Sequence, residues 1–270
     1  MAAPIAAARE GAPPTDDEVL AAARALGGLA RGSVALWREL SDPQVEAQRV
    51  ARVLHADPGI AARVVKVANS AFYGRGRQVA SIDRAIVVLG LDAVRGIAAA
   101  AGLDQVVPRG VAGTAFAAHC TVVATLARAL ARDAGGVAAA DAFLAGLLHD
   151  FGLLVAWRLA TTGQASAAAD DRLHAHWGAM VLGAWQLPEA IVETVAQHHD
   201  ADGGGRLGAC VRVAHDAALL HAGGLPVEPA RSLEAAAGDL AACGIEPQRW
   251  QDWVSGAGAA AVAEGLALAA

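Results

Sequence analysis

The chain has 270 residues, of which 55% are hydrophobic and 18% are charged, and this composition excludes a mainly disordered protein. Aromatic residues make up only 4%, whereas alanine, the strongest helix former, is abundant, so an all-β fold is excluded as well. The formal net charge of −6 argues against nucleic acid as a partner, because proteins that bind its phosphate backbone are usually basic.

The sequence also indicates the compartment. The N-terminal residues lack the basic and apolar regions of a secretory signal, and the most apolar long stretch, 85–103, is interrupted by Asp92 and Arg95. The three cysteines lie far apart and form no CxxC pair, which argues against a disulfide framework or a zinc ribbon. We therefore expect a cytoplasmic protein without a membrane span, in which the cysteines are small core residues.

The first half of the chain carries a series of helix signals. Residues 1–18 are rich in proline and alanine, and we expect them to be disordered. After them, three helices are expected to begin at N-cap residues, two of which precede a proline: Asp42 with Pro43, Asp57 with Pro58, and Ser81 ahead of 82–90. Proline and glycines at 104–113 then predict a boundary between a helical N-terminal lobe, 19–110, and a second helical lobe, 114–225.

The second half is also expected to be helical. Thr114 is the expected cap of a long helix to about Asp133. Further helices are expected at 141–149, 171–185, 188–199 and 207–222, followed by a C-terminal helical extension at 226–270. Because no segment alternates in the manner of a strand, the sequence predicts an all-α fold in two lobes.

Histidine is concentrated in this second half. Eight of the nine histidines follow the boundary, and several lie on or beside the apolar face of their expected helix. A buried imidazole needs a polar partner, and several of them meeting in one core could share a divalent metal ion such as Zn, Fe, Ni or Mn. The alternative is that each histidine is a core residue hydrogen-bonded to a carbonyl, which is the commoner situation for a single histidine.

Several motifs resemble known families. AGLLHDFG at 145–152 and the HH pair at 198–199 resemble the HD superfamily of metal-dependent phosphohydrolases. DPGIAARVVKVANSAFYG at 57–74 and SIDRAIVVLGLDAVR at 81–95 closely resemble the HDOD domain, the HD-related output domain of bacterial signalling proteins, and WQLPEAIVETVAQHH at 185–199 fits the same family. The resemblance implies an HD-like helical core with an additional helical N-terminal lobe, and a regulatory role in which catalysis is usually absent or unproven.

The resemblance also implies a set of metal ligands. The ligands of the HD superfamily fall on His119, His149 and Asp150. Those of the HD-GYP relatives, which hydrolyse cyclic di-GMP, add His174, His198 and His199. The closing aspartate of the pattern falls at His215, next to Asp216, and both residues are further candidates.

Two departures from the enzymes bear on activity. Leu153 stands where the enzymes of this superfamily have a lysine, and DADGGG follows His199 where HD-GYP proteins have GYP. A leucine contributes no positive charge to a reacting phosphate. The sequence therefore favours a non-catalytic signalling module that binds proteins or a ligand, with partners of the receiver, diguanylate cyclase or kinase type. The alternatives are a metal-dependent phosphohydrolase of nucleotides or cyclic dinucleotides, and a sensor that uses the ancestral pocket without chemistry.

One segment of the first lobe is a candidate partner surface. Arg63, Lys66, Asn69 and Tyr73 could present polar groups to another protein. The alternative, which we favour, is that the segment locks the end of its helix and fills the seam between the lobes.

Overall fold

The computed structural model describes residues 14–40, 42, 46–70, 73, 79–161, 171–201, 203–222 and 231–269. Within these ranges the chain is helical and has no β-strand, which confirms the prediction of an all-α fold. The elements are α1 (Asp16–Leu40), α2 (Ala47–His55), α3 (Pro58–Ala68), α4 (Ile82–Leu89), α5 (Leu91–Asp104), α6 (Val111–Ala134), α7 (Ala139–Leu148), α8 (Phe151–Thr161), α9 (Asp171–Ala184), α10 (Glu189–Ala196), α11 (Gly205–Ala222), α12 (Ala237–Ala242), η1 (Pro247–Arg249), α13 (Trp250–Trp253), η2 (Val254–Gly258) and α14 (Ala259–Ala269).

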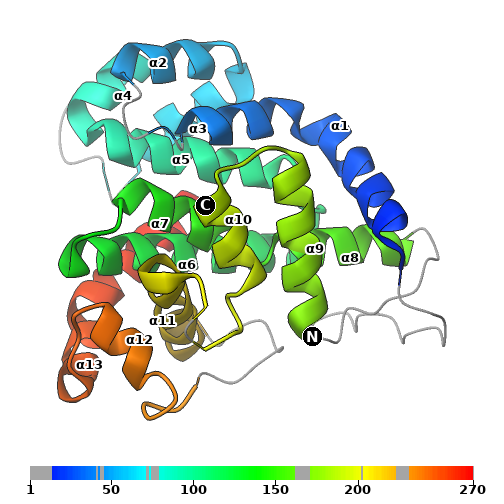
Figure 1. Ribbon diagram of the computed structural model, residues 1–270. Helices are drawn as coiled ribbons and strands as arrows, with labels where there is room; N and C mark the ends of the chain where they lie inside the picture. The colour runs from blue at the N-terminus through cyan, green and yellow to red at the C-terminus, as the bar shows by residue number, and fades with distance from the viewer. Residues whose placement is uncertain are drawn as a thin grey trace.

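The N-terminal helices pack around α5. Figure 1 shows α2 to α5 together at one end of the molecule, while α1 crosses from them toward α8 and α9. Residues 94–103 of α5 are buried throughout, because alanine and glycine let the neighbouring helices approach on every side. Trp37 of α1 is fully buried, donates from Nε1 to the carbonyl of Ala99 at 3.1 Å, and meets Phe151 of α8 edge to face. A single core therefore runs through both halves of the chain.

Two of the predicted helix starts are confirmed. Asp57 Oδ1 accepts the backbone N–H groups of Gly59 and Ile60 at 2.9 and 3.1 Å, with Pro58 as the first helical residue. Ser81 Oγ accepts the N–H of Arg84 at 3.2 Å. Side-chain acceptors satisfy N–H groups that have no partner within the helix, which is why these positions begin α3 and α4.

Three other starts are corrected. Helix α2 begins at Ala47 after an extended Glu46, so Asp42 does not cap it; residues 43–45 lie outside the described ranges. Helix α6 begins at Val111 after Gly110, whose φ of 119° favours glycine, and the Thr114 hydroxyl donates to the Gly110 carbonyl instead of capping. Residues 16–18, expected to be disordered, form the first turn of α1, and residues 1–13 lie outside the described ranges.

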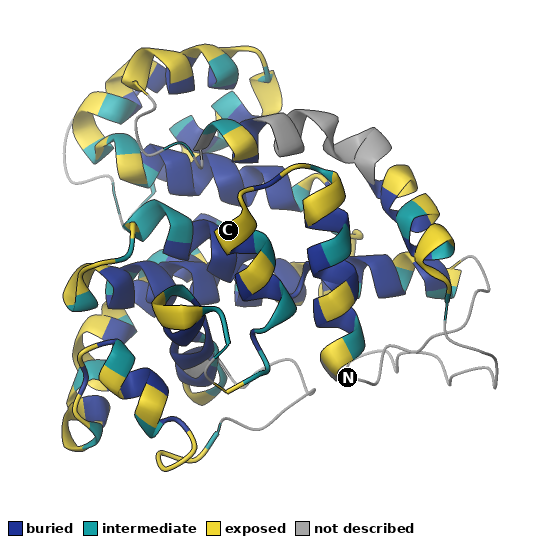
Figure 2. Ribbon diagram, in the orientation of Figure 1, coloured by how far each residue is buried: buried dark blue, intermediate teal, exposed yellow. Residues whose placement is uncertain are grey.

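Helix α6 is the centre of the second half. It packs against α7, α11 and α14, and most of its residues are buried (Figure 2). The stretches Val111–Ala134 and Ala139–Thr161 are long and apolar enough to cross a membrane, but 78% and 83% of their most apolar windows are buried inside the protein. Core packing therefore accounts for their hydrophobicity.

The C-terminal extension folds back onto the same helix. Helix α14 lies against α6 at Gly265, where an added Cβ would fall 2.7 Å from the Cα of Val122.

All three cysteines are buried and none is in a disulfide; the Sγ atoms of Cys210 and Cys243 are 3.7 Å apart.

Candidate metal centre

Five helical segments bring polar side chains to one point in the second half of the fold. His119 lies in the middle of α6, and His149 with Asp150 forms the turn between α7 and α8. His174 is in the first turns of α9. His198 and His199 directly follow α10, and His215 lies on α11.

The carboxylate of Asp150 lies between two groups of histidines. Its Oδ2 is 3.2 Å from His149 Nε2 and 3.7 Å from His119 Nε2. Its Oδ1 is 3.3 Å from His174 Nε2 and 3.5 Å from His198 Nε2. The two oxygens of one side chain therefore face different sets of nitrogen atoms.

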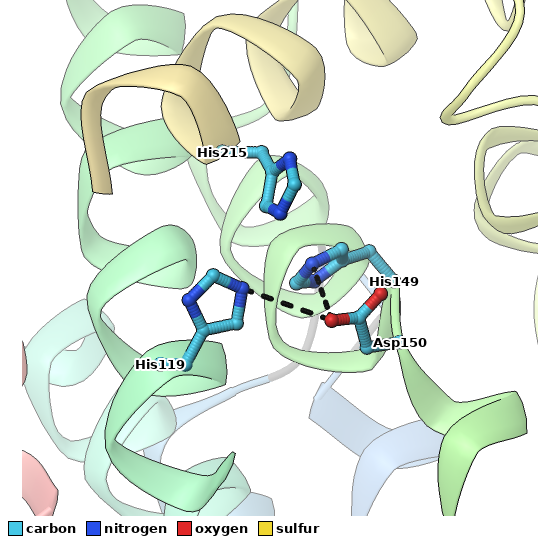
Figure 3. Close-up of side chains that lie close together, drawn as sticks. All are labelled: His119, His149, Asp150 and His215. Carbon is cyan, nitrogen blue, oxygen red and sulfur yellow. Dashed lines mark ion pairs between the residues drawn. The ribbon is translucent and has the colours of Figure 1, made fainter. Parts of the chain in front are cut away.

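We call these sets the first and the second half-cluster. The first comprises His119, His149 and His215, which point toward one another and toward Asp150 (Figure 3). The second comprises His174, His198 and His199. In each half-cluster the potential ligand atoms, including one from Asp150, lie within 4.8 Å of one another.

Backbone carbonyls fix the tautomers of two of the rings. His149 Nδ1 lies 2.8 Å from the Gly146 carbonyl oxygen, and His198 Nδ1 lies 2.7 Å from that of Val195. A carbonyl only accepts, so each Nδ1 carries the proton and each Nε2 of the neutral ring presents a lone pair. The Nε2 of His149 is buried without a hydrogen-bond partner, 3.2 Å from an oxygen that carries negative charge. A proton on Nε2 or a metal cation bound there makes this contact attractive.

The ring nitrogens of the second half-cluster also lie at distances that suit a shared metal ion. His174 Nε2 is 3.2 Å from His198 Nε2 and 3.1 Å from His199 Nε2. Imidazole nitrogens bind divalent ions at about 2.0–2.1 Å, so neighbouring ligand atoms lie roughly 3.0–3.4 Å apart. The spacing of these nitrogens and the chemistry of the donor set therefore fit a divalent metal ion.

Burial keeps most of these histidines in the form that binds metal. Burial, together with the neighbouring histidines, lowers the pKa of His119 to about 4 and that of His199 to about 3. The pKa values of His198 and His215 are also lowered, mainly by burial. These four imidazoles are therefore neutral at neutral pH, as metal coordination requires.

Asp150 and His149 behave differently because they face each other. Burial is the largest effect and opposes ionisation of both groups. It is outweighed by their mutual attraction together with the bond of His149 to the Gly146 carbonyl and the imidazoles of His174 and His198 that face Asp150. The pKa of His149 is raised and that of Asp150 lies well below its usual range. The centre thus holds one carboxylate among buried imidazoles.

One candidate ligand is excluded. Asp216 turns away from the cluster, and its carboxylate accepts the backbone N–H and the Nε of Arg231, each at 2.9 Å. Neighbouring residues on a helix point about 100° apart, so His215 and Asp216 cannot both face the same core. The seven other candidate residues lie together in the two half-clusters.

Most of the residues considered as a partner surface have contacts within the chain. Arg63 pairs with Asp104 and donates to the carbonyl of Leu268. The amide of Asn69 bonds to the carbonyls of Val65 and Val79 and accepts the N–H of Val79. The Tyr73 hydroxyl bonds to Glu264 of α14, and Lys66 is exposed. Asn69 thus locks the end of α3, while Arg63 and Tyr73 hold the C-terminal helix.

The all-α fold and its buried histidine–aspartate cluster place the protein in the HD-like helical class. The HDOD domain profile matches residues 29–201, and the chain therefore belongs to the HDOD domain family. An uncharacterized protein of Treponema pallidum is 23% identical over an alignment of 188 positions that covers 61% of this chain. The matched part is 36% of that protein, so this chain spans only part of its relative's length.

Solved structures share the fold. An HDOD domain protein with unknown function from Geobacter sulfurreducens has a TM-score of 0.69 at 23% identity, covering 92% of this chain and 97% of the other. A "putative phosphohydrolase" from Shewanella amazonensis has a TM-score of 0.67 at 20% identity, covering 93% and 98%. A "putative signal transduction protein" from Marinobacter aquaeolei has a TM-score of 0.70 at 20% identity, covering 94% and 65%.

Proposed function

We propose that this protein is a regulatory HDOD module of a bacterial signalling pathway, which holds divalent metal in its histidine–aspartate cluster and acts by binding partner proteins. The burial of the cluster carries the proposal. Asp150 and the four histidines next to it are each at most 6% exposed: His119, His149, His174 and His198. A hydrolytic centre has to admit a phosphate ester and keep a coordination position open for water. A centre in which only His199 and His215 are half-buried and the other ligands are buried suits a metal that sets the shape of the module.

The residue at the position of the superfamily's lysine supports a role without turnover. Leu153 is half-buried and packs against the core. It therefore supplies no charge to a phosphate group at the cluster. The partners that suit such a module are signalling proteins of the receiver, diguanylate cyclase or kinase type, in the bacterial cytoplasm.

The second candidate function is metal-dependent phosphoester hydrolysis. It is favoured by the position of Asp150, whose two oxygens face different half-clusters. Two ions held about a shared carboxylate can activate water and stabilise the charge of a phosphodiester during its cleavage. The chain's own contribution would be to hold the ions and to exclude bulk water around them.

Metal analysis together with a hydrolysis assay separates the two candidates. Protein without a histidine tag is purified, analysed for Fe, Mn, Ni and Zn, and assayed with bis(p-nitrophenyl) phosphate and with cyclic dinucleotides. We expect metal close to stoichiometric amounts and no turnover above that of a His149→Ala, Asp150→Ala double variant. Turnover that disappears in the double variant would establish the hydrolase, and a metal content equal to that of the double variant would refute the metal centre.

Leu153→Lys is the matched gain-of-function control. It places a positive charge three residues after Asp150 without changing any of the proposed ligands. If the missing charge is the only reason that the protein does not hydrolyse substrate, the variant acquires turnover that the unmodified protein lacks. If the cluster is closed to substrate, the variant keeps its metal and remains inactive.

A further inference from the structure

A buried ion pair lies behind the second half-cluster. Arg212 of α11 donates from Nε and Nη2 to the two carboxylate oxygens of Asp239 at 2.9 and 2.7 Å. Both side chains are at most 7% exposed, and Arg231 adds a further bond to Asp239 at 2.7 Å. A two-pronged arginine–carboxylate pair of this kind fixes the orientation of the guanidinium as well as its position.

The remaining nitrogen of Arg212 reaches the turn that carries two histidines. Arg212 Nη1 donates to the Gly203 carbonyl at 2.5 Å and lies 3.5 Å from that of Gln197. The Gln197 side chain closes the same turn by accepting the N–H of Gly204 at 2.6 Å. Gly208 of α11 allows the close approach, because a Cβ there would fall 2.2 Å from the Gly203 oxygen.

The two half-clusters therefore differ in how they are held. His119 and His215 lie within long helices, and His149 directly follows the buried helix α7. His198 and His199, in contrast, lie on the turn after α10, described at 197–201, 203 and 204, which a bond from Arg212 ties to α11. Removing a group that hydrogen-bonds directly to a metal ligand commonly weakens metal affinity by about 10–100-fold. Arg212 acts one step further out, on the backbone next to the two histidines.

We propose that Arg212, held in place by Asp239, is a positioning residue for His198 and His199, and that it sets the metal affinity of the second half-cluster. The inference rests on the proposed metal centre. It gives the C-terminal segment a role, because Asp239 lies on α12, next to α11 (Figure 1) and beyond the HDOD match at 29–201. A conformational change of the C-terminal segment would thus alter the metal centre through Arg212.

The test uses Co²⁺ as the probe, because its visible absorption reports coordination. The metal-free 270-residue chain is titrated with Co²⁺ in its unmodified form and as Asp239→Asn, which keeps the shape of the side chain but removes its charge. We expect the unmodified chain to bind two equivalents, and Asp239→Asn to bind one of them about 10–100-fold more weakly while the other is unchanged. His199→Ala and His119→Ala assign the equivalents to the second and the first half-cluster.

Glu264→Gln is the matched control. Glu264 pairs with Arg128, another buried arginine, at 2.5 Å, and the neighbours of this pair are Tyr73 and Phe143, not residues of the turn after α10. It should retain both equivalents, so that a general loss of stability is distinguished from loss of positioning. If Asp239→Asn fails to fold, Arg212→Lys keeps the positive charge without the two-pronged contact, and the same selective weakening is expected.

Hydrogen exchange of the metal-free proteins separates the two proposals. We expect faster exchange of the amides of 197–201, 203 and 204 in Asp239→Asn than in the unmodified chain, and no such change in Glu264→Gln. No Co²⁺ binding by the unmodified chain would refute the metal centre, while the exchange result would still test the positioning. Unchanged affinity for both equivalents, a single equivalent that survives His199→Ala, or unchanged exchange of the turn would overturn the positioning role.

Discussion

Gly152, two residues after Asp150, is a position at which the fold has no room for a side chain. A Cβ there would fall 1.8 Å from the carbonyl oxygen of His174, on the facing helix α9. A backbone atom cannot move aside by changing rotamer, so Gly152→Ala has to separate α8 from α9 and displace His174. We expect a loss of about 3 kcal/mol or more in the free energy of unfolding, the upper part of the range for overpacked cores.

Gly183→Ala is the control for this prediction. Gly183 lies on α9, the helix that Gly152 faces, but the nearest atom outside that helix would be 3.8 Å from the new Cβ, an ordinary contact. The replacement should leave stability unchanged or raise it by up to about 1 kcal/mol, the helix-propensity difference between glycine and alanine. Urea unfolding followed by circular dichroism measures both variants, and equal effects would contradict the steric argument.

At the residue scale the sequence predicted which side chains could be metal ligands, but not which of them point toward the cluster. His215 and Asp216 are both plausible ligands by type, and only the rotation of α11 decides between them. Arg212 and Asp239 carry no recognisable sequence signal, because their role depends on contacts between segments distant in the chain.

At the scale of single elements, the cap of α3 provides a quantitative test. Asp57→Ala removes the acceptor of two backbone N–H groups and should cost about 1 kcal/mol of stability at neutral pH. Asp57→Asn is the matched control, because asparagine caps nearly as well as aspartate, and it should retain most of the stability. Thermal unfolding at neutral pH measures both, and a loss in Asp57→Asn equal to that in Asp57→Ala would argue against the cap.

The same cap has a defined pH dependence. The pKa of Asp57 is lowered, first of all by the hydrogen bond from the backbone of Ile60. A carboxyl whose pKa is lower in the folded protein stabilises it above the ordinary value of 3.8, and this contribution is lost as the pH falls through the lowered value. The stability difference between the unmodified chain and Asp57→Ala should therefore shrink on acidification, and a difference that grows would contradict this assignment.

Local signals were sufficient for helices whose ends are set by local bonds, and insufficient elsewhere. The caps of α3 and α4 depend on residues two or three positions away, so the sequence predicted both. Helix α8 was not anticipated, because the turn at His149–Asp150 that precedes it contains no proline or glycine. Contacts with α6, α9 and α11 place that turn, and these are tertiary.

At the scale of the whole molecule, the periodicity of the sequence did not establish that the histidine-bearing helices converge. Apolar faces predict which side of a helix is buried, but not which helices meet. The resemblance to HD proteins supplied the ligand set, and the structure brings seven of the eight candidates together from five segments. The return of α14 onto α6 could not be predicted either, because it depends on the fit of Gly265 against Val122.

Because the ligands come from helices that are distant in the chain, metal binding should stabilise the whole fold. A ligand that binds only the folded chain adds about 2.7 kcal/mol when its concentration is 100 times its dissociation constant. For domains of 150–250 residues, 1 kcal/mol corresponds to about 2–4 °C in Tm, so loading the centre should raise Tm by roughly 5–11 °C. Removing the metal with a chelator should lower Tm by the same amount, as followed by scanning calorimetry.

The control for this effect is the His149→Ala, Asp150→Ala double variant, which removes the central carboxylate and one of the most buried rings. Its Tm should not respond to the chelator, because it has no centre to empty. A Tm of the unmodified chain that is the same with and without bound metal would mean that the cluster holds its geometry unaided. The helices would then be held together by apolar packing alone, and the metal would have no means of setting the shape that a partner protein recognises.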